Sequence, residues 1–203
     1  MAKVVPNPEN IRSFRTEAAL EKWMRANHAR AVELWLRIYK KDSGRPTVTY
    51  AEALDVALCW GWIDGIRKGC DDCSFLQRYT PRRPKSIWST INRTHVARLI
   101  DAGRMTPHGL RQVEAAKADG RWDAAYAPIR SFSVDTVPAD LRAAIEANPR
   151  ALRTFQTLGR VNLFALTFRT NNMKTPAGRT RKIAALVAML ARGDTIVPER
   201  RRK

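Results

Sequence analysis

Apolar and polar residues alternate in three stretches of the first half of this chain. Between Val32 and Tyr39 every second residue is apolar, which predicts a strand with one strongly apolar face. Trp62–Lys68 and Ser74–Thr80 also have a strand pattern, and the polar residues 69–73 between them predict a hairpin turn. The first half is therefore expected to hold a small sheet of about three strands.

Helical patterns surround these strands. A helix is expected over 16–27, where apolar residues recur three or four positions apart. Thr49 and Glu52 have the spacing of a capping box, in which two residues cap each other's backbone N–H groups. A second helix is therefore expected to begin at Tyr50, and it ends at Gly61.

From Ser89 onward the pattern is helical throughout. Three helices are expected to begin at a capping residue followed by proline, at Thr106-Pro107, Asn148-Pro149 and Thr175-Pro176. The stretch 161–169 is apolar nearly all round, so we expect it in the most buried helix of the second half. The fold class predicted is α+β, with helices covering a small N-terminal sheet and an all-helical C-terminal half.

The pattern divides the chain into four parts. We expect an α/β domain over 14–95, a helical connector over 96–135 and a C-terminal helical module over 136–197. The last residues, 198–203, are rich in arginine and are expected to form a disordered basic tail.

The charge of the chain is large and unevenly placed. A total of 37 Lys and Arg against 19 Asp and Glu gives a net charge of +18. Residues 1–77 carry 12 basic and 10 acidic side chains, whereas residues 78–121 carry 10 and 3, and residues 142–203 carry 14 and 3. Such a field attracts polyanions without naming one, so nucleic acid is a candidate partner beside a small anion.

No stretch is typical of a targeting signal or a membrane span. The N-terminal residues contain two prolines and no long apolar run, and the longest apolar stretch, 161–168, is too short to cross a bilayer. The three cysteines are an odd number and do not form the framework of a secreted, disulfide-rich protein. We therefore expect a cytosolic protein.

Cys70 and Cys73 have the C-x-x-C spacing of metal and redox sites. A structural zinc needs four ligands, and neither Cys59 nor the histidines are spaced to supply the others. A redox pair normally lies at a helix N-terminus, whereas this pair lies in a predicted turn beside Asp71 and Asp72, whose charges oppose thiolate formation. We interpret the pair as incidental turn residues and expect no metal or cofactor.

Asp64 is the acidic residue in the most apolar part of the first half. Alternation along the strand places it on the face of Trp62 and Ile66. It would serve there either as the general base of a hydrolase or transferase, or as the structural partner of an arginine. Because no His, Cys or Ser partner accompanies it, the structural role is favoured.

A basic loop after the last strand is the strongest candidate for ligand binding. Pro81 and Pro84 stiffen it, which lowers the entropy cost of presenting its cations. Guanidinium groups bind phosphate and carboxylate, and they stack on aromatic rings. The candidate ligand-binding residues of this segment are Arg78, Arg82, Arg83, Lys85 and Trp88, and Asp64 is a ligand-binding candidate beside them. The alternative is a solvated loop whose arginines pair with Glu52, Asp55 or Asp64.

Two further cations belong to the last helix. Arg179 lies one turn before Ile183 on the apolar face, so it is either buried in a salt bridge or lines a pocket. Lys174, just before the helix, would join it at a pocket. The chain has no phosphate-binding glycine loop, Rossmann fingerprint, nucleophile elbow or two-histidine metal helix, so no standard enzyme class is indicated.

Six ordered blocks of sequence carry a resemblance to a known family. They are Tyr50-Ala-Glu-Ala-Leu54, Leu58-Cys-Trp-Gly-Trp-Ile-Asp64, Thr80-Pro-Arg-Arg-Pro-Lys-Ser86, Ile87-Trp-Ser89, Gly103-Arg-Met-Thr106 and Ala118-Asp-Gly-Arg-Trp-Asp123. In these blocks the chain resembles the YdeI/OmpD-associated family, the bacteriocin-protection proteins, over about 14–196. The helices from about Pro138 resemble that family's helical module, and the N-terminal half is similar to small α/β domains of a frataxin-like or YjbR-like grouping.

The resemblance implies a role in tolerance to bacteriocins or envelope stress, and it supplies no catalytic residues. We therefore expect a non-enzymatic, cytosolic binding protein that holds a small anionic or aromatic molecule between its α/β half and its helical half. A nucleic-acid-binding protein that uses the basic surface is the first alternative. A hydrolase or transferase that uses Asp64 is the second.

Overall fold

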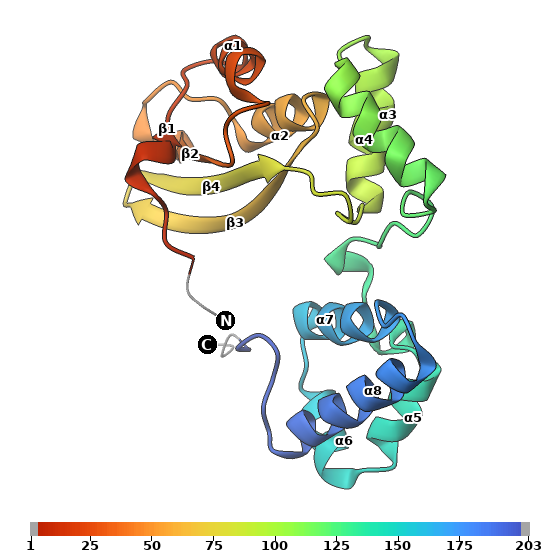
Figure 1. The fold of residues 1–203 in the computed structure, drawn as a ribbon. Helices are drawn as coiled ribbons and strands as arrows, with labels where there is room; N and C mark the ends of the chain where they lie inside the picture. Colours follow the sequence, from red (N-terminus) through yellow and green to blue (C-terminus); the bar gives the residue numbers. More distant parts are fainter. Residues whose placement is uncertain (1–3, 200–203) are drawn as a thin grey trace. The chain divides into compact units, whose positions relative to one another are not determined.

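A computed structural model of the chain describes residues 4–199. It divides into two compact units, Met1–Ala125 (unit 1) and Tyr126–Lys203 (unit 2). Within the described residues, the strands belong to unit 1 and unit 2 is helical (Figure 1). The α+β class expected from the sequence is confirmed.

The sheet of unit 1 has four strands. They are β1 (Ile11–Arg12), β2 (Leu34–Tyr39), β3 (Trp62–Asp71) and β4 (Ser74–Pro81), in the order β1-β2-β4-β3. β1 pairs parallel to β2, and the other pairs are antiparallel. The three longer strands were predicted. β1 was not, because two residues are too few to show an alternating pattern.

Two helices, α1 (Glu17–Asn27) and α2 (Tyr50–Cys59), lie over one face of the sheet (Figure 1). The predicted capping box at the start of α2 is present. Gly61 follows α2 with a φ of 75°, a left-handed conformation that glycine adopts without strain. Two more helices, α3 (Thr90–Asp101) and α4 (Pro107–Ala118), contact α2.

The core of unit 1 lies between the sheet and these helices. Leu34, Leu36 and Ile38 belong to it, as the alternation in β2 predicts. Val32 was expected on the same face, but it precedes the strand and is 77% exposed. All six tryptophans of the chain belong to unit 1, so its apolar residues include most of the large aromatic rings.

β3 departs from strict alternation at a bulge. Asp64 pairs with Tyr79, but the next register position pairs Arg67 with Gln77, so β3 carries one extra residue. Beyond the bulge Arg67 lies on the face of Asp64, and Ile66 is exposed. The prediction that Ile66 shares that face was wrong, because the extra residue reverses the alternation.

Unit 2 consists of helices around its own core. Its elements are two short 3₁₀ helices, η3 (Ile129–Ser131) and η4 (Val134–Thr136), followed by α5 (Ala139–Glu146), α6 (Pro149–Gln156), α7 (Arg160–Asn171) and α8 (Pro176–Ala191). The cap-plus-proline signals at α6 and α8 are confirmed by hydrogen bonds to the side chains of Asn148 and Thr175. The core includes Leu141, Ile145, Phe155, Leu166, Leu186 and Leu190.

α7 has more buried residues than the other helices of unit 2, as expected. It is not buried all round, since Val161 is 46% exposed. Of the predicted basic tail, residues 200–203 lie outside the described part. Glu199 accepts hydrogen bonds from the Gly159 backbone N–H (2.7 Å) and the Asn162 side chain (2.8 Å), so this residue is tied to the start of α7.

Candidate anion-binding site

A buried arginine–tryptophan stack holds the loop between β4 and α3. The Cζ atom of Arg82 lies 3.5 Å from the centroid of the Trp88 ring. Arg82 also donates from its backbone N–H to the Gly61 carbonyl (3.0 Å) and from Nη1 to the Ile87 carbonyl (3.2 Å). Arg82 is only 7% exposed and Trp88 only 2%. This buried pair therefore holds the loop in place, and any contact with a ligand falls to the exposed residues next to it.

Arg83 and Lys85 are the exposed cations of this loop. The backbone N–H of Arg83 donates to Oγ of Ser86 (2.9 Å), which closes a tight turn. The Ser86 carbonyl in turn accepts a hydrogen bond from Nη1 of Arg121 (2.6 Å). The turn that carries both cations is therefore tied to the segment after α4.

Trp122 extends the basic surface toward α3 and α4. Its ring meets Trp88 edge to face, with the centroids 4.9 Å apart. The Arg93 guanidinium lies 5.3 Å from the Trp122 ring centroid and donates to the Trp122 carbonyl (2.9 Å). Nζ of Lys117 lies 5.7 Å from the same ring. Cations are attracted to the face of an aromatic ring, so Trp122 holds two of them beside the loop.

We call these residues together the Trp122 surface: Arg83, Lys85, Arg93, Lys117, Arg121 and Trp122. Sequence reasoning selected only the first two as ligand contacts, because the others come from α3, α4 and the segment after α4. The block 118–123, which belongs to the family resemblance, contains Arg121 and Trp122, whereas Arg93 and Lys117 lie outside it.

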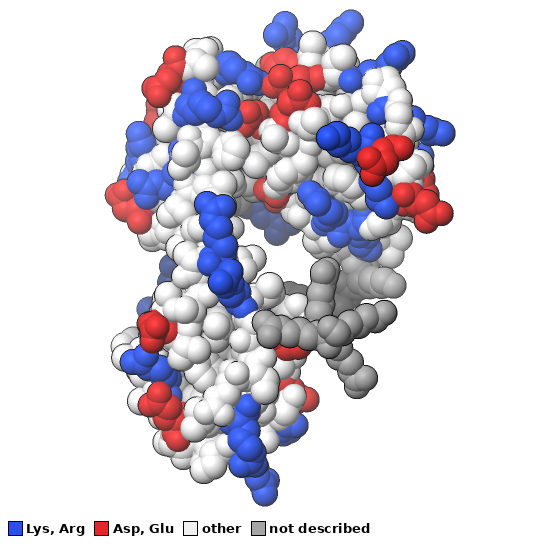
Figure 2. Space-filling model, turned by 180° about the vertical axis from the view of Figure 1, so that it is seen from behind, with Lys and Arg blue, Asp and Glu red and all other residues white. Residues whose placement is uncertain are grey.

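The Trp122 surface keeps an unbalanced positive charge. Within residues 4–199 only Arg121 of its five cations has an ion-pair partner, Asp119 at 2.7 Å. The hydrogen bond from Arg121 lowers the pKa of Asp119 below its usual value. Figure 2 shows acidic side chains among the Lys and Arg on one side of unit 1, so no continuous basic stripe crosses that side.

Arg78 belongs to a different cluster. Its Nε donates to Oε2 of Glu33 (2.7 Å), and its guanidinium lies 5.9 Å from the Trp35 ring. Burial alone would raise the pKa of Glu33, but hydrogen bonds from Asn10 and Arg78 outweigh that effect and the pKa is lowered. Arg78 therefore has an acidic partner just before β2, whereas Arg83 and Lys85 have no ion-pair partner among residues 4–199.

Asp64 is held by a tyrosine rather than by an arginine. It accepts a hydrogen bond from the Tyr50 hydroxyl (2.7 Å), and it lies opposite Tyr79 in the sheet. Burial is the largest cause that raises the pKa of Tyr79, and the charges of Tyr50 and Asp64 add to it. The nearby cation is Arg67, whose guanidinium lies 5.1 Å from the Tyr50 ring.

The hairpin that carries the cysteine pair is organised by Asp71. This carboxylate accepts hydrogen bonds from Oγ of Ser74 (2.7 Å) and the backbone N–H of Cys73 (3.1 Å), and it pairs with Arg37. The bond from Ser74 is the largest cause that lowers the pKa of Asp71. All three cysteines are free, and the described residues contain no group of three or more His, Cys, Asp or Glu placed to hold a metal.

The N-terminal and C-terminal parts of the chain match two different protein families. Residues 136–193 match the family described as Bacteriocin-protection, YdeI or OmpD-Associated. We call this matched segment, residues 136–193, the bacteriocin-protection domain, after the family that it resembles. Residues 12–112 match a different family, described as a domain of unknown function (DUF8412). No curated protein and no solved structure matches the chain.

The predicted resemblance is thus confirmed over the bacteriocin-protection domain, which is shorter than the expected 14–196. The sequence blocks that suggested it lie at 50–123, before the matched residues. Neither family description names a reaction. Among residues 4–199, no helix is both long enough and apolar enough to cross a membrane.

Arg179 joins three helices of the bacteriocin-protection domain. It forms a two-pronged ion pair with Asp140, with Nε–Oδ2 2.6 Å and Nη2–Oδ1 2.8 Å, and its Nη1 donates to the Thr170 carbonyl (3.1 Å). The pairing raises the pKa of Arg179 and lowers that of Asp140. Of the two interpretations open from the sequence, these contacts favour the salt bridge. Lys174 is exposed and has no ion-pair partner within the described chain.

Proposed function

We propose that this protein is a non-enzymatic binding protein whose ligand is a small anionic molecule held at the Trp122 surface. The observation that carries the proposal is four cations without an ion-pair partner in the described part of unit 1, two beside the Trp122 ring and two on the loop that the Arg82–Trp88 stack holds. Those cations are Arg83, Lys85, Arg93 and Lys117. Unpaired charge beside a rigid aromatic pair suits a ligand that has both a phosphate or carboxylate and a flat part.

Rigidity of the loop adds to this support. The Arg82–Trp88 stack and the bond from Arg121 to the Ser86 carbonyl fix the backbone that carries two of the cations. A preorganised site loses less entropy on binding than a flexible one. We further propose a cytosolic location, which the three free cysteines support, and a role in bacteriocin tolerance, which the C-terminal family's description suggests.

A thermal-shift titration tests the proposal. The probes are inorganic phosphate, adenosine monophosphate and adenosine, which separate the charged part of a ligand from its flat part. We expect adenosine monophosphate to raise the melting temperature, phosphate to raise it less and adenosine to leave it unchanged. At ten times the Kd, a bound ligand adds about 1.4 kcal/mol to the free energy of unfolding.

Matched variants separate this site from net charge. Arg83→Gln with Lys85→Gln removes two charges from the Trp122 surface, and Lys22→Gln with Arg25→Gln removes two exposed charges from α1. Only the first double variant is expected to lose the shift. If none of the anionic probes raises the melting temperature, or if both double variants lose the shift equally, the proposal is wrong.

A second candidate function, nucleic-acid binding, is favoured by the charge of unit 2. Eight of its cations are at least partly exposed and have no ion-pair partner among the described residues: Arg130, Arg150, Arg153, Arg160, Arg169, Lys174, Arg181 and Lys182. Binding of a labelled 20-base duplex or single strand would then weaken steeply between about 50 and 200 mM salt, because counterions are released. Arg150→Gln with Arg153→Gln would weaken it, whereas the Arg83 and Lys85 variant would not.

A further inference from the structure

A cavity on the α1 side of unit 1 is lined by residues whose chemistry differs from that of the Trp122 surface. It has a volume of about 460 Å³ and is lined by Glu17, Ala18, Glu21, Cys59 and Arg104. The first three come from α1, Cys59 ends α2, and Arg104 lies in the connection between α3 and α4. Two carboxylates and one guanidinium leave this cavity with excess negative charge in a chain whose net charge is +18.

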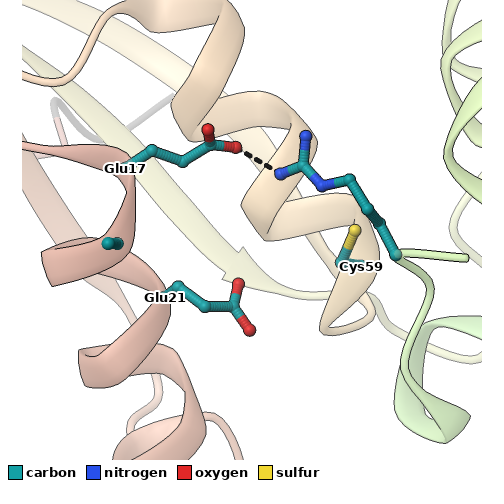
Figure 3. Close-up of a pocket in the computed structure, with 5 residues that line it drawn as sticks. Glu17, Glu21 and Cys59 are labelled. Carbon is teal, nitrogen blue, oxygen red and sulfur yellow. Dashed lines mark hydrogen bonds and ion pairs between the residues drawn. The ribbon is translucent and has the colours of Figure 1, made fainter. Parts of the chain in front are cut away.

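The two carboxylates are in different states. Glu17 forms an ion pair with Arg104, so much of its charge is compensated. Glu21 accepts a hydrogen bond from Nε1 of Trp60 (2.9 Å) on Oε1, and its other oxygen has no partner in the described part of the chain. Figure 3 shows Glu17 and Glu21 extending from α1 toward the end of α2, where Cys59 lies. The cavity therefore offers the carboxylate of Glu21, which is held by Trp60 through one oxygen and can accept a hydrogen bond from a ligand with the other.

Cys59 contributes a neutral, weakly polar surface. It is 2% exposed, yet it lines the cavity, and its thiol has no hydrogen-bond partner within residues 4–199. Burial raises its pKa to about 11, against the lowering effect of Arg104. The thiol is thus protonated at neutral pH and favours contact with an apolar part of a ligand over nucleophilic attack.

Arg104 supplies the opposite charge at the same cavity. A single nitrogen, Nη2, pairs with Glu17, and the other guanidinium N–H groups have no hydrogen-bond partner within the described chain. A ligand with a free carboxylate would find donors here, while its ammonium group would find the free oxygen of Glu21. A ligand carrying both charges has no net charge, so the +18 field of the protein does not repel it as it repels a simple cation.

We propose that this cavity binds a small zwitterion of the α-amino acid class. The ammonium group pairs with Glu21, the carboxylate with Arg104, and the side chain packs on Ala18 and Cys59. The volume lies in the range of cavities that enclose small organic ligands. This inference is independent of the Trp122 surface and stands or falls separately from it.

Isothermal titration with three related probes tests the inference on the full chain. L-Leucine carries both charges, 3-methylbutylamine lacks the carboxylate, and 4-methylpentanoate lacks the ammonium group. We expect L-leucine to bind at least tenfold more tightly than either analogue. If L-leucine does not bind at about 10 mM, where a millimolar Kd would be saturated, or if the amine binds as tightly, the inference is overturned.

Substitutions assign the contacts. Glu21→Gln keeps an oxygen for the Trp60 indole and removes the charge, and Arg104→Gln removes the guanidinium; each is expected to weaken L-leucine binding at least tenfold. Glu114→Gln, at an exposed α4 residue without an ion pair among the described residues, is the control and should change nothing. If Arg104→Gln does not fold, Arg104→Lys keeps the charge and should retain weakened binding. Unchanged binding in Glu21→Gln would refute the assignment.

Discussion

The contact between α2 and α4 depends on the absence of a side chain at Gly109. A Cβ atom placed there would lie 2.4 Å from the Cys59 carbonyl oxygen and 2.7 Å from that of Leu58. Both neighbours are backbone atoms, so neither can rotate away. Because carbon and oxygen normally approach to about 3.3 Å, Gly109→Ala would push α4 away from α2 by about 1 Å.

The expected loss of stability combines opposing effects. Alanine stabilises a helix interior by about 1 kcal/mol relative to glycine. Overpacking costs about 1–3 kcal/mol, and the displacement also weakens the hydrogen bond from Thr106 Oγ1 to the Cys59 carbonyl (2.6 Å), worth about 1 kcal/mol. The difference is a net loss of about 1–3 kcal/mol in the free energy of unfolding of unit 1.

Urea denaturation followed by tryptophan fluorescence measures this loss. All six tryptophans lie in unit 1, so the signal reports that unit. Ala115→Gly, at an exposed position of the same helix, measures the propensity effect alone and should cost about 1 kcal/mol. If Gly109→Ala instead gains about what Ala115→Gly loses, the helices are not in close contact and the reasoning is refuted.

Three further predictions concern ionisable groups. Asp140→Asn should destabilise the bacteriocin-protection domain by no more than about 1 kcal/mol, since its ion pair with Arg179 is partly exposed; thermal unfolding followed by far-UV circular dichroism measures this. Burial is the first cause that lowers the pKa of His108, so the unfolded chain binds its proton more readily. Stability should therefore fall as the pH drops below about 6.5, and His108→Gln should flatten this dependence in melting curves; an unchanged slope would contradict it. At pH 8 a thiol reagent should label two cysteines quickly and Cys59 only on unfolding, because its pKa is about 11; rapid labelling of all three would show an open site.

Local signals were enough to predict most helices and three strands. A capping box, proline after a capping residue and apolar spacing act within a few residues, so the starts of α2, α6 and α8 follow from the sequence. Local signals did not predict β1 or the bulge in β3. β1 exists only because β2 offers a parallel edge, and the bulge places Arg67 where alternation predicted Ile66.

The candidate sites required the tertiary structure. From the sequence alone came the positive charge after Arg78 and the stiff basic loop. The packing of the folded chain buries Arg82 and Trp88 and brings Arg179 into an ion pair with Asp140. Neither the Trp122 surface nor the cavity beside Cys59 could be predicted from the sequence, because their residues span 39 and 87 positions of the chain and meet only when the helices pack. Charge and periodicity are properties of the chain, whereas which charges remain unpaired is a property of the fold.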